Sequence, residues 1–437
     1  MADDWSHYSL DDLCNLITDG KHGDSQNESA SDYYFLSVKD VFDNRLVYEN
    51  ARQITKADFL ETHRRTNLEP GDILFTNTGT IGRMAIAPDD TKTPRTTFQK
   101  SVAILKPKRN LVEPRFLYYI LKFDNARLSE LAAGTTQKNL LLKDFRSFEV
   151  KIPDTGEQHA ITHILGTLDD KIEVNRRMNE TLEAMARALF KSWFVDFDPV
   201  RAKAEGRDPG LPEPLADLFP FRLVDSELGE IPEGWEIKPV GDLADVVGGT
   251  TPSTKEPRYW EGGTHAWATP KDLSGVSVPV LLDTERRITD AGLSQVGSGL
   301  LPKGTILLSS RAPIGYLAVA ELPVAINQGF IAMVAKAGAS NLFLLQWASV
   351  AHEDIVSRAN GSTFLEISKT NFRPIPVVTP SARVMQSFEK LARPLYERIV
   401  ECERQSRALA ELRDSLLPKL ISGELRVSTA QEALETG

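Results

Sequence analysis

Two stretches of the chain carry apolar or small residues at alternating steps of four and three, a spacing that places them on one face of an α-helix. The first stretch opens with Thr155 and Gln158, the pattern of a helix-capping box. Its row is Ile161, Leu165, Leu168, Ile172, Asn175, Asn179, Leu182, Ala186, Leu189 and Trp193. The second row lies 227 residues later and is Phe388, Ala392, Leu395, Ile399, Cys402, Ser406, Leu409, Arg413, Leu416 and Leu420. The pattern therefore predicts two long amphipathic helices.

Each of these helices needs a partner, because a long amphipathic helix is stabilised mainly by packing its apolar face. We expect the two rows to form an antiparallel coiled-coil seam, in which Asn175 and Asn179 meet Ser406 and Cys402 and fix the register. Pro394 lies inside the second row, opposite Gly166–Thr167 of the first, and predicts that both helices kink or restart there. The alternative is that each helix packs only on its own neighbouring module.

The regions before the two helices read as mixed α/β modules. In the first module, short apolar runs at 34–38, 72–75 and 101–105 predict strands between Gly, Asn and Thr turns, and residues 116–121 predict a helix.

The two modules repeat each other. Residues 71–82 (GDILFTNTGTIG) recur as 304–315 (GTILLSSRAPIG), and Gly134-Thr-Thr with Asp144-Phe-Arg146 recurs as Gly361-Ser-Thr with Asn371-Phe-Arg373. A period of about 230 residues indicates a duplicated unit, since solenoid repeats are about 20 to 50 residues long.

The predicted organisation has six parts. They are a first module (1–153), a first helix (154–195), an extended acidic linker (196–234), a second module (235–380), a second helix (381–422) and a tail (423–437). The fold class is α+β, with two similar mixed α/β modules separated by two long helices.

The net charge of −10 is unevenly distributed and does not exclude nucleic acid as a partner. Residues 1–150 carry 20 basic and 22 acidic side chains, residues 236–380 carry 12 and 13, and residues 195–235 carry 4 and 10. The modules are therefore nearly neutral. A basic run in the first module indicates either a phosphate-binding surface or a solvated face. It consists of Lys92, Arg95, Lys100, Lys106, Lys108, Arg109 and Arg115, against Glu113 alone.

The sequence predicts a cytoplasmic protein. It has no apolar run of the length that a membrane helix needs, and its acidic N-terminus is unlike a signal peptide. Cys14 and Cys402 are its only cysteines, which argues against a disulfide framework.

Local motifs in the linker and near the end are more specific. Trp193-Phe-Val-Asp-Phe-Asp-Pro199-Val is followed by Gly210-Leu-Pro, Asp217-Leu-Phe-Pro220 and residues 226–235 (SELGEIPEGW). The second helix ends in residues 415–425 (SLLPKLISGEL). In this order, with the two modules and two helices, these motifs resemble the specificity subunit of a type I restriction–modification system, over essentially the whole chain.

The resemblance implies that the modules are two target recognition domains, each reading one half of a split double-stranded DNA sequence. It implies that the helices dock two methyltransferase subunits, and that two restriction subunits can join. S-adenosylmethionine would bind the methyltransferase subunits, and ATP and Mg the restriction subunits, so that this chain is not an enzyme and holds no cofactor.

The residues themselves agree with the absence of catalysis. There is no Asp/Asn-Pro-Pro-Tyr/Phe motif, no phosphate-binding loop ending in Gly-Lys-Ser/Thr and no His-Glu-x-x-His motif. His159 and His163 lie one helical turn apart and could share a metal, but no third ligand accompanies them, and we interpret them as exposed helix residues.

Candidates for DNA contact are the basic and hydrogen-bonding residues of the turns in each module. In the first module they are Lys21, His22, Lys39, Arg64, Arg65, Asn77, Thr78, Arg83, Gln99, Lys100, Thr135, Thr136, Gln137 and Lys138. In the second they are Lys255, Arg258, Tyr259, Lys271, Arg286, Arg287, Ser310, Arg311, Tyr316, Gln328, Ser362 and Thr363.

Comparison of matched positions separates two roles. Positions shared by the modules, such as Lys39/Lys271 and Gln99/Gln328, are expected to set backbone geometry, whereas positions that differ are better candidates for base choice.

Two other functions remain open. One is a stand-alone coiled-coil DNA-binding regulator or scaffold without enzyme partners, and the other is an enzyme with its site between the modules.

Overall fold

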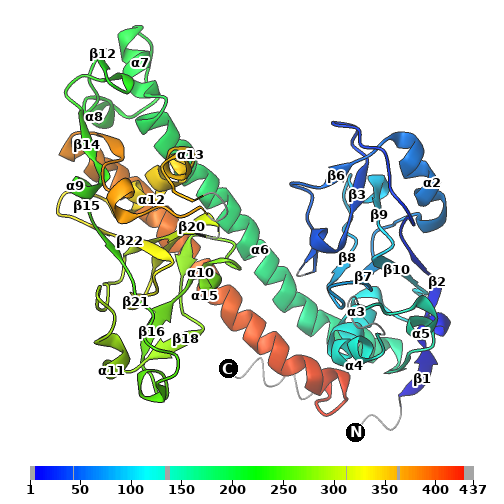
Figure 1. The fold of residues 1–437 in the computed structure, drawn as a ribbon. Helices are drawn as coiled ribbons and strands as arrows, with labels where there is room; N and C mark the ends of the chain where they lie inside the picture. Colours follow the sequence, from blue (N-terminus) through cyan, green and yellow to red (C-terminus); the bar gives the residue numbers. More distant parts are fainter. Residues whose placement is uncertain (1–4, 43, 133–137, 312, 362–364, 428–437) are drawn as a thin grey trace. The chain divides into compact units, whose positions relative to one another are not determined.

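The computed structural model describes residues 5–42, 44–132, 138–311, 313–361 and 365–427, and the chain divides into two compact units. The first unit comprises residues 1–172 and 408–437, and the second comprises residues 173–407 (Figure 1). Helices α6 (Thr155–Phe194) and α15 (Ala382–Ile421) each contribute one part to each unit. Among the described helices, none is long and apolar enough to cross a membrane.

The first unit is built on a four-stranded antiparallel sheet of order β2-β10-β7-β8. A second sheet has the order β6-β3-β9. The bounds of these strands are β2 Cys14–Asp19, β10 Val102–Pro107, β7 Ile73–Thr76, β8 Met84–Ile86, β6 Arg52–Gln53, β3 Tyr34–Leu36 and β9 Thr96–Phe98. The strand pairs β1 (Ser6–Ser9) with β11 (Glu149–Ile152) and β4 (Val41–Phe42) with β5 (Arg45–Leu46) complete it.

The helices of the first unit are short, and most lie in the connections. They are α1 Leu10–Leu13, η1 Val38–Asp40, α2 Lys56–Thr66, η2 Thr93–Arg95, α3 Pro114–Phe123, α4 Asn125–Glu130 and α5 Leu142–Arg146. Helix α3 is the most deeply buried of them, with residues 116–121 all in the core, as its uninterrupted apolar run predicts.

The second unit repeats this topology. Its main sheet has the order β15-β22-β19-β20-β17, and a second sheet has the order β18-β16-β21. Its strands are β15 Ala244–Gly248, β22 Phe330–Ala335, β19 Ile306–Ser310, β20 Ile314–Ala320, β17 Val280–Leu281, β18 Arg286–Ile288, β16 His265–Ala268, β21 Val324–Ile326, β14 Glu236–Pro239 and β23 Pro376–Thr379. In both units the strand pairing within the second sheet is antiparallel on one side and parallel on the other. The internal repeat predicted from the sequence is therefore a repeat of fold.

The helices of the second unit follow the same plan. They are α9 Val240–Leu243, η3 Pro257–Tyr259, α10 Pro270–Leu273, α11 Asp290–Leu293, α12 Asn341–Val350, α13 His352–Ser357 and α14 Lys369–Phe372. With the long helices, these elements make the α+β class with two similar mixed α/β modules that the sequence predicts, and that prediction is confirmed.

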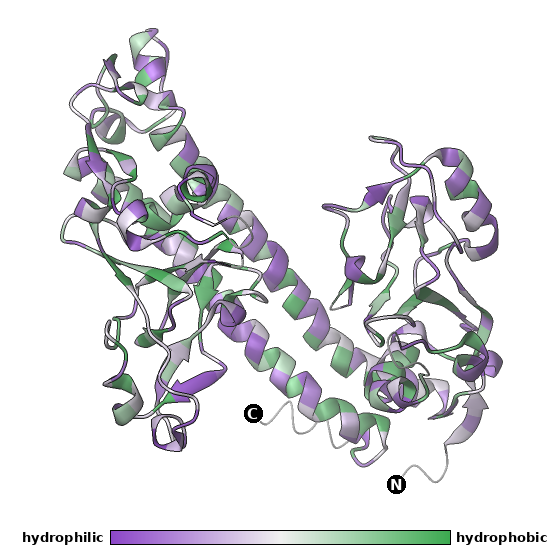
Figure 2. Cartoon of the chain, viewed as in Figure 1, coloured by the Kyte–Doolittle hydropathy of each residue, from purple (hydrophilic) through white to green (hydrophobic). Residues whose placement is uncertain are grey.

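The two long helices pair antiparallel within each unit. In the second unit Asn175 Nδ2 donates to Gln405 Oε1 at 2.9 Å, to Ser406 Oγ at 3.3 Å and to the Cys402 carbonyl at 3.4 Å. In the first unit Arg413 Nη1 lies 2.6 Å from Asp169 Oδ1. No member of either row is exposed, and Arg413 is the charged member of the two rows. Hydrophilic residues lie on other faces of both helices (Figure 2). The predicted polar layer at Asn175 thus lies between the helices.

The helices do not restart at Pro394 or at Gly166–Thr167, and that part of the prediction is wrong. Helices α6 and α15 are each continuous over 40 residues. Pro394 is exposed, and its flanking residues Ala392 and Tyr396 are buried in the core. The packing of these neighbours outweighs the backbone hydrogen bond that a proline removes.

The segment 196–234, predicted as an extended linker, is folded instead. It forms α7 (Asp198–Ala204), α8 (Glu213–Ala216) and a hairpin of β12 (Leu223–Ser226) and β13 (Gly229–Pro232). Phe197 and Phe219 of this segment are buried, whereas Phe221 is exposed. The rings of Phe219 and Trp193 of α6 lie 5.0 Å apart, and those of Phe197 and Trp235 lie 5.8 Å apart. Aromatic burial of this kind offsets the entropy of ordering a proline-rich chain, which composition alone does not reveal.

Candidate nucleic-acid interface

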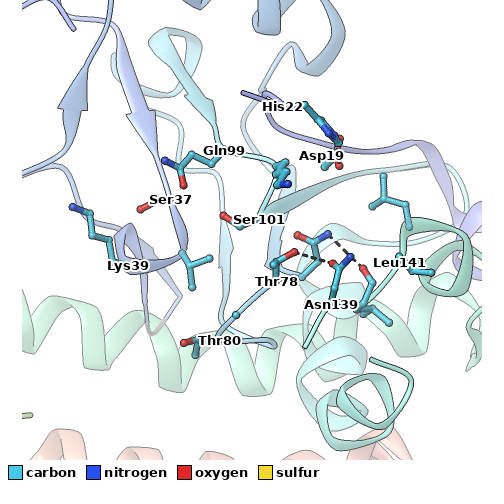
Figure 3. A pocket seen from close by; sticks show the side chains of 16 residues that line it. Asp19, His22, Ser37, Lys39, Thr78, Thr80, Gln99, Ser101, Asn139 and Leu141 are labelled. Atoms are coloured by element: carbon cyan, nitrogen blue, oxygen red, sulfur yellow. Dashed lines mark hydrogen bonds and ion pairs between the residues drawn. The ribbon is translucent and has the colours of Figure 1, made fainter. Parts of the chain in front are cut away.

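A hollow of about 810 Å³ in the first unit gathers six of the predicted contact residues. These residues are His22, Lys39, Asn77, Thr78, Gln99 and Lys100. They come from the end of β2, from η1, and from the turns after β7 and β9, and residues 139–142 close the hollow (Figure 3). The sheet order explains the gathering, because β2 and β7 both flank β10.

The polar groups of the hollow are held by local hydrogen bonds. Thr78 Oγ1 donates to Asn139 Oδ1 at 2.8 Å, and Asn77 Nδ2 lies 3.4 Å from the Leu140 carbonyl (Figure 3). Asn77 is buried, and its Oδ1 has no hydrogen-bond partner among the described residues. An amide oxygen left in this state is costly unless a ligand or water satisfies it.

Lys39 and Lys100 supply the positive charge. Both are exposed, and no acidic side chain within the described ranges pairs with either of them. Lys39 is placed by a capping box in which Ser37 N donates to Asp40 Oδ2 at 2.7 Å. His22 is held by Asp19, whose Oδ2 lies 2.9 Å from the imidazole Nε2.

The backbone packing beside the hollow requires glycine at position 20. A Cβ at Gly20 would lie 2.0 Å from the Phe98 carbonyl oxygen, and a Cβ at the matched Gly249 would lie 1.9 Å from that of Ile326. In each unit, the backbone at this glycine therefore lies too close to a neighbouring strand for any larger residue.

Other predicted residues of the first unit lie elsewhere or have structural partners. Lys21 forms ion pairs with Asp58 at 2.8 Å and Glu61 at 2.9 Å. Arg65 donates to Thr18, Asp19 and the Gly20 carbonyl. Arg64 is exposed on α2, Lys138 is exposed next to Asn139, and Arg83 lies over the Phe42 ring. Thr135, Thr136 and Gln137 lie outside the described residues.

The basic run at 92–115 is mostly a set of structural contacts, because its members reach partners on different elements. Lys106 pairs with Asp72 at 2.6 Å, and Arg115 pairs with Asp170 at 2.8 Å. Lys108 donates to the Asp12 carbonyl at 2.8 Å. Of this run, Lys100 is the residue that lines the hollow. The interpretation of the run as one phosphate-binding surface stays a prediction, which the ion pairs of Lys106 and Arg115 weaken.

The matched positions of the second unit have the same backbone setting and different side-chain partners. Lys271 lies in the capping box of Thr269 and Asp272, as Lys39 does in that of Ser37 and Asp40, but pairs with Glu285 at 2.7 Å. Gln328 accepts a hydrogen bond from Thr251. Ser310 is buried in β19, and the backbone N of Tyr316 donates to Ser309 Oγ at 2.8 Å.

Basic and aromatic side chains meet on β18 and η3. The guanidinium of Arg286 lies 3.7 Å from the ring centroid of Trp260, and that of Arg258 lies 5.0 Å from that of Tyr259. Arg287 pairs with Asp283 at 2.7 Å, and Lys255 is exposed. Ser362 and Thr363 lie outside the described residues.

Sequence reasoning missed Asp19, Ser37, Thr80 and Ser101 as lining residues of the hollow. The Ser37–Asp40 spacing was a usable signal, because it predicts a cap that would fix Lys39. The position of Ser101 depends on sheet pairing and gave no local signal.

His159 and His163 are exposed on α6 and line a depression with Glu113, Arg115 and Asp170. Across the described part of the chain, no cluster of three or more His, Cys, Asp or Glu residues could hold a metal ion.

A carboxyl group without a good partner lies on the second-unit part of α6. Glu183 lines a cavity of about 250 Å³ with Tyr316 and Gln346, its Oε1 has no hydrogen-bond partner among the described residues, and Arg187 is 3.9 Å away. Burial raises the pKa of Glu183 to about 7.

The pH dependence of stability should therefore change in Glu183→Gln. Because the folded pKa is above the unfolded value of 4.5, Glu183 destabilises the folded chain as pH rises from 4.5 through about 7. At pH 8, Glu183→Gln should raise the free energy of unfolding by about 2–3 kcal/mol relative to the native chain, with little difference at pH 5. Urea unfolding at both pH values measures this, and an equal effect at both would contradict it.

Comparison with known proteins shows that the chain carries two copies of a DNA specificity domain. The sequence pattern of the type I restriction modification DNA specificity domain matches residues 2–184 and 232–387, more than half of the chain. The chain belongs to the family of type I restriction–modification specificity subunits, which are non-catalytic.

Relatives match over nearly the full length. The type I restriction enzyme HindI specificity subunit of Haemophilus influenzae is 27% identical over 97% of this chain and 100% of its own. The type I restriction enzyme MjaIX specificity subunit of Methanocaldococcus jannaschii is 28% identical over 91% of this chain and 88% of its own. The crystal structure of a type I restriction–modification S subunit from M. genitalium covers 95% of this chain and 96% of its own, with a TM-score of 0.58 and 17% identity, and shares its fold.

Proposed function

We propose that this chain reads a split double-stranded DNA target, with one module for each half-site, and carries methyltransferase subunits on its long helices. The observation that supports DNA reading most directly is the hollow of the first unit. There, two exposed lysines that pair with no acidic side chain of the described residues flank hydrogen-bonding side chains from five separate segments.

This arrangement suits DNA for two physical reasons. Lysines at the rim contribute sequence-independent attraction to phosphates, and this attraction is salt-dependent. Side chains such as Asn77, Thr78 and Gln99 offer donors and acceptors that can pair with base edges. In the second unit the same roles would fall to Arg286 and Arg258, with Ser310, Arg311 and Gln328 at the matched turns.

Binding of specific DNA should become less salt-dependent in Lys39→Ala/Lys100→Ala. If each lysine contacts one phosphate, the slope of log K against log salt should become shallower by roughly 1.8, and affinity at low salt should fall about uniformly for all sequences. Titration of the assembled complex with its target duplex at several salt concentrations measures the slope.

The matched control is Lys56→Ala/Lys151→Ala, which removes two exposed lysines of the same unit that do not line the hollow. A slope unchanged in the Lys39/Lys100 variant, or changed equally in the control, would argue against the hollow as the interface.

Partner docking is supported by a second row on α6, outside the seam. Val174, Met178 and Met185 are 51%, 39% and 51% exposed, and Thr181 and Ala188 are exposed between and after them. Their 4-3-4-3 spacing is that of a coiled-coil face, and methionine adapts to a partner helix.

The second helix carries a comparable face. Ala408, Leu412 and Ser415, spaced by four and three, are exposed on the part of α15 in the first unit. A repeated docking face favours two copies of one partner, which we propose to be methyltransferase subunits. These would bring S-adenosylmethionine, and two restriction subunits, where present, would bring ATP and Mg.

A further inference from the structure

We infer that the Thr78–Asn139 pair and the Arg311–Glu366 pair occupy the same place in the two modules and select different base pairs. The inference rests on the proposed function and goes beyond it by assigning a base-pair class to each half-site. The first pair would select A·T, and the second would select G·C.

The backbone shows that the two pairs are equivalent. Thr78 and Asn139 form an isolated antiparallel bridge, and so do Arg311 and Glu366. Directly beside each bridge, Leu140 N donates to the Asn77 carbonyl at 2.8 Å, and Ile367 N donates to the Ser310 carbonyl at 3.0 Å.

The turn that carries the first member of each pair is also the same. Thr76 Oγ1 donates to the Thr80 carbonyl at 2.6 Å and accepts from Arg83 N at 2.9 Å. In the second unit, Ser309 Oγ donates to the Pro313 carbonyl at 2.7 Å and accepts from Tyr316 N at 2.8 Å. Equivalent hydroxyl groups of Thr76 and Ser309 therefore stabilise the same type of turn in the two units. The residue two positions later is Thr78 in the first unit and Arg311 in the second.

The first pair faces the hollow. Both Thr78 and Asn139 line it, and Thr78 Oγ1 donates to Asn139 Oδ1 at 2.8 Å (Figure 3). This bond uses one acceptor site of the amide and leaves the Asn139 amide group able to donate and accept on its outer side. An asparagine presenting both functions matches N6 and N7 of adenine.

The second pair is accessible and loosely held. The side chains of Arg311 and Glu366 are 38% and 49% exposed, and their closest N···O distance is 3.7 Å, which is longer than a hydrogen bond. Both groups can therefore turn toward a ligand at little cost. A guanidinium pairs with O6 and N7 of guanine, and a carboxylate accepts from N4 of cytosine.

The pairs thus differ in chemistry at a place where the turn, the bridge and the neighbouring backbone hydrogen bond are repeated. Selection for the stability of this turn and bridge alone would act on both modules alike. A change from two neutral groups to two charged groups is instead what different base pairs require.

The test uses the complex of the full chain with its methyltransferase subunits. Its target duplex is found by mapping methylated bases in the source genome, and every base pair of both half-sites is then substituted singly. We expect one G·C position in the second half-site at which substitution weakens binding of the native complex about 10- to 100-fold. In Arg311→Ala this discrimination should fall to less than about threefold, with discrimination in the first half-site unchanged.

Two further variants separate recognition from structure. Arg311→Lys keeps the positive charge but cannot form the two-bond contact, so it should also lose discrimination at that position. Asn139→Ala should lose discrimination at one A·T position of the first half-site and leave the second unchanged.

Three outcomes would overturn the inference. These are retained discrimination in Arg311→Ala, equal weakening at every position of both half-sites, and loss confined to an A·T position of the second half-site. If the native complex itself were indifferent to one half-site, the proposed two-part reading would fail as well. The native titration therefore distinguishes the two failures.

Discussion

Replacing Arg413 by alanine is expected to lower the free energy of unfolding of the first unit by about 3–5 kcal/mol. The Arg413 and Asp169 side chains are 11% and 9% exposed, with Nη1 and Oδ1 2.6 Å apart. Tyr119 donates its hydroxyl to the other oxygen of Asp169 at 2.7 Å, so the carboxylate ties α15 to α6 and α3. Loss of the guanidinium leaves the buried Asp169 carboxylate without its ion-pair partner, which is far more costly than loss of a surface pair.

The matched control is Arg177→Ala, which removes an arginine of α6 that is 72% exposed and pairs with Glu173 at 2.8 Å. Such a surface pair contributes about 0.3–0.5 kcal/mol. Hydrogen exchange of peptides from α3 and α15 under native conditions measures the first unit by itself, and urea unfolding gives the overall change. A cost for Arg413→Ala no larger than that for Arg177→Ala would show that the buried pair does not hold the helices together.

Replacing Met178 and Met185 together by glutamate is expected to weaken methyltransferase binding by more than about 100-fold. Each methionine would bury apolar surface contributing about 1.5–3 kcal/mol, and each glutamate would have to lose its hydration in the interface. The variant should remain folded alone, because both positions are exposed on α6. Co-purification and titration with the methyltransferase subunit measure the loss.

The matched control is Met178→Leu/Met185→Leu, which keeps the volume and the apolar character and should bind within a few-fold of the native chain. Native binding by the glutamate variant would exclude this face of α6 from docking. If the native chain purified alone and bound its DNA without any methyltransferase, the stand-alone regulator would become the better interpretation.

The fold was predictable where a pattern is local. The four-and-three rows predicted both long helices and their phase, and Asn175 lies against Cys402 and Ser406 as the polar layer required. The repeated turn motifs predicted two similar modules. The predicted restart was wrong because α15 continues through Pro394, with Ala392 and Tyr396 buried on either side of it. The predicted extended linker was wrong because Phe197, Phe219 and Trp235 have buried partners that the periodicity of the sequence does not reveal.

The sequence predicted which types of residue form the candidate site, but it did not predict which individual residues of those types line it. Lys21, Lys39 and Lys100 are alike in sequence, yet Lys21 is neutralised by Asp58 and Glu61 while Lys39 and Lys100 flank the hollow. Likewise, Lys39 and Lys271 lie in equivalent capping boxes of the two units. They differ because Lys271 forms an ion pair with Glu285.

The sequence by itself determined the duplication, the helix phase and the family, because these depend on spacing and on residues close together along the chain. Tertiary structure decided which polar side chains meet, since sheet order brings residues 19–22, 77–80 and 99–101 to one hollow and ion pairs remove other cations from use. Pairing across strands and between helices joins residues far apart in the chain, and its energy depends on burial that a linear pattern does not contain.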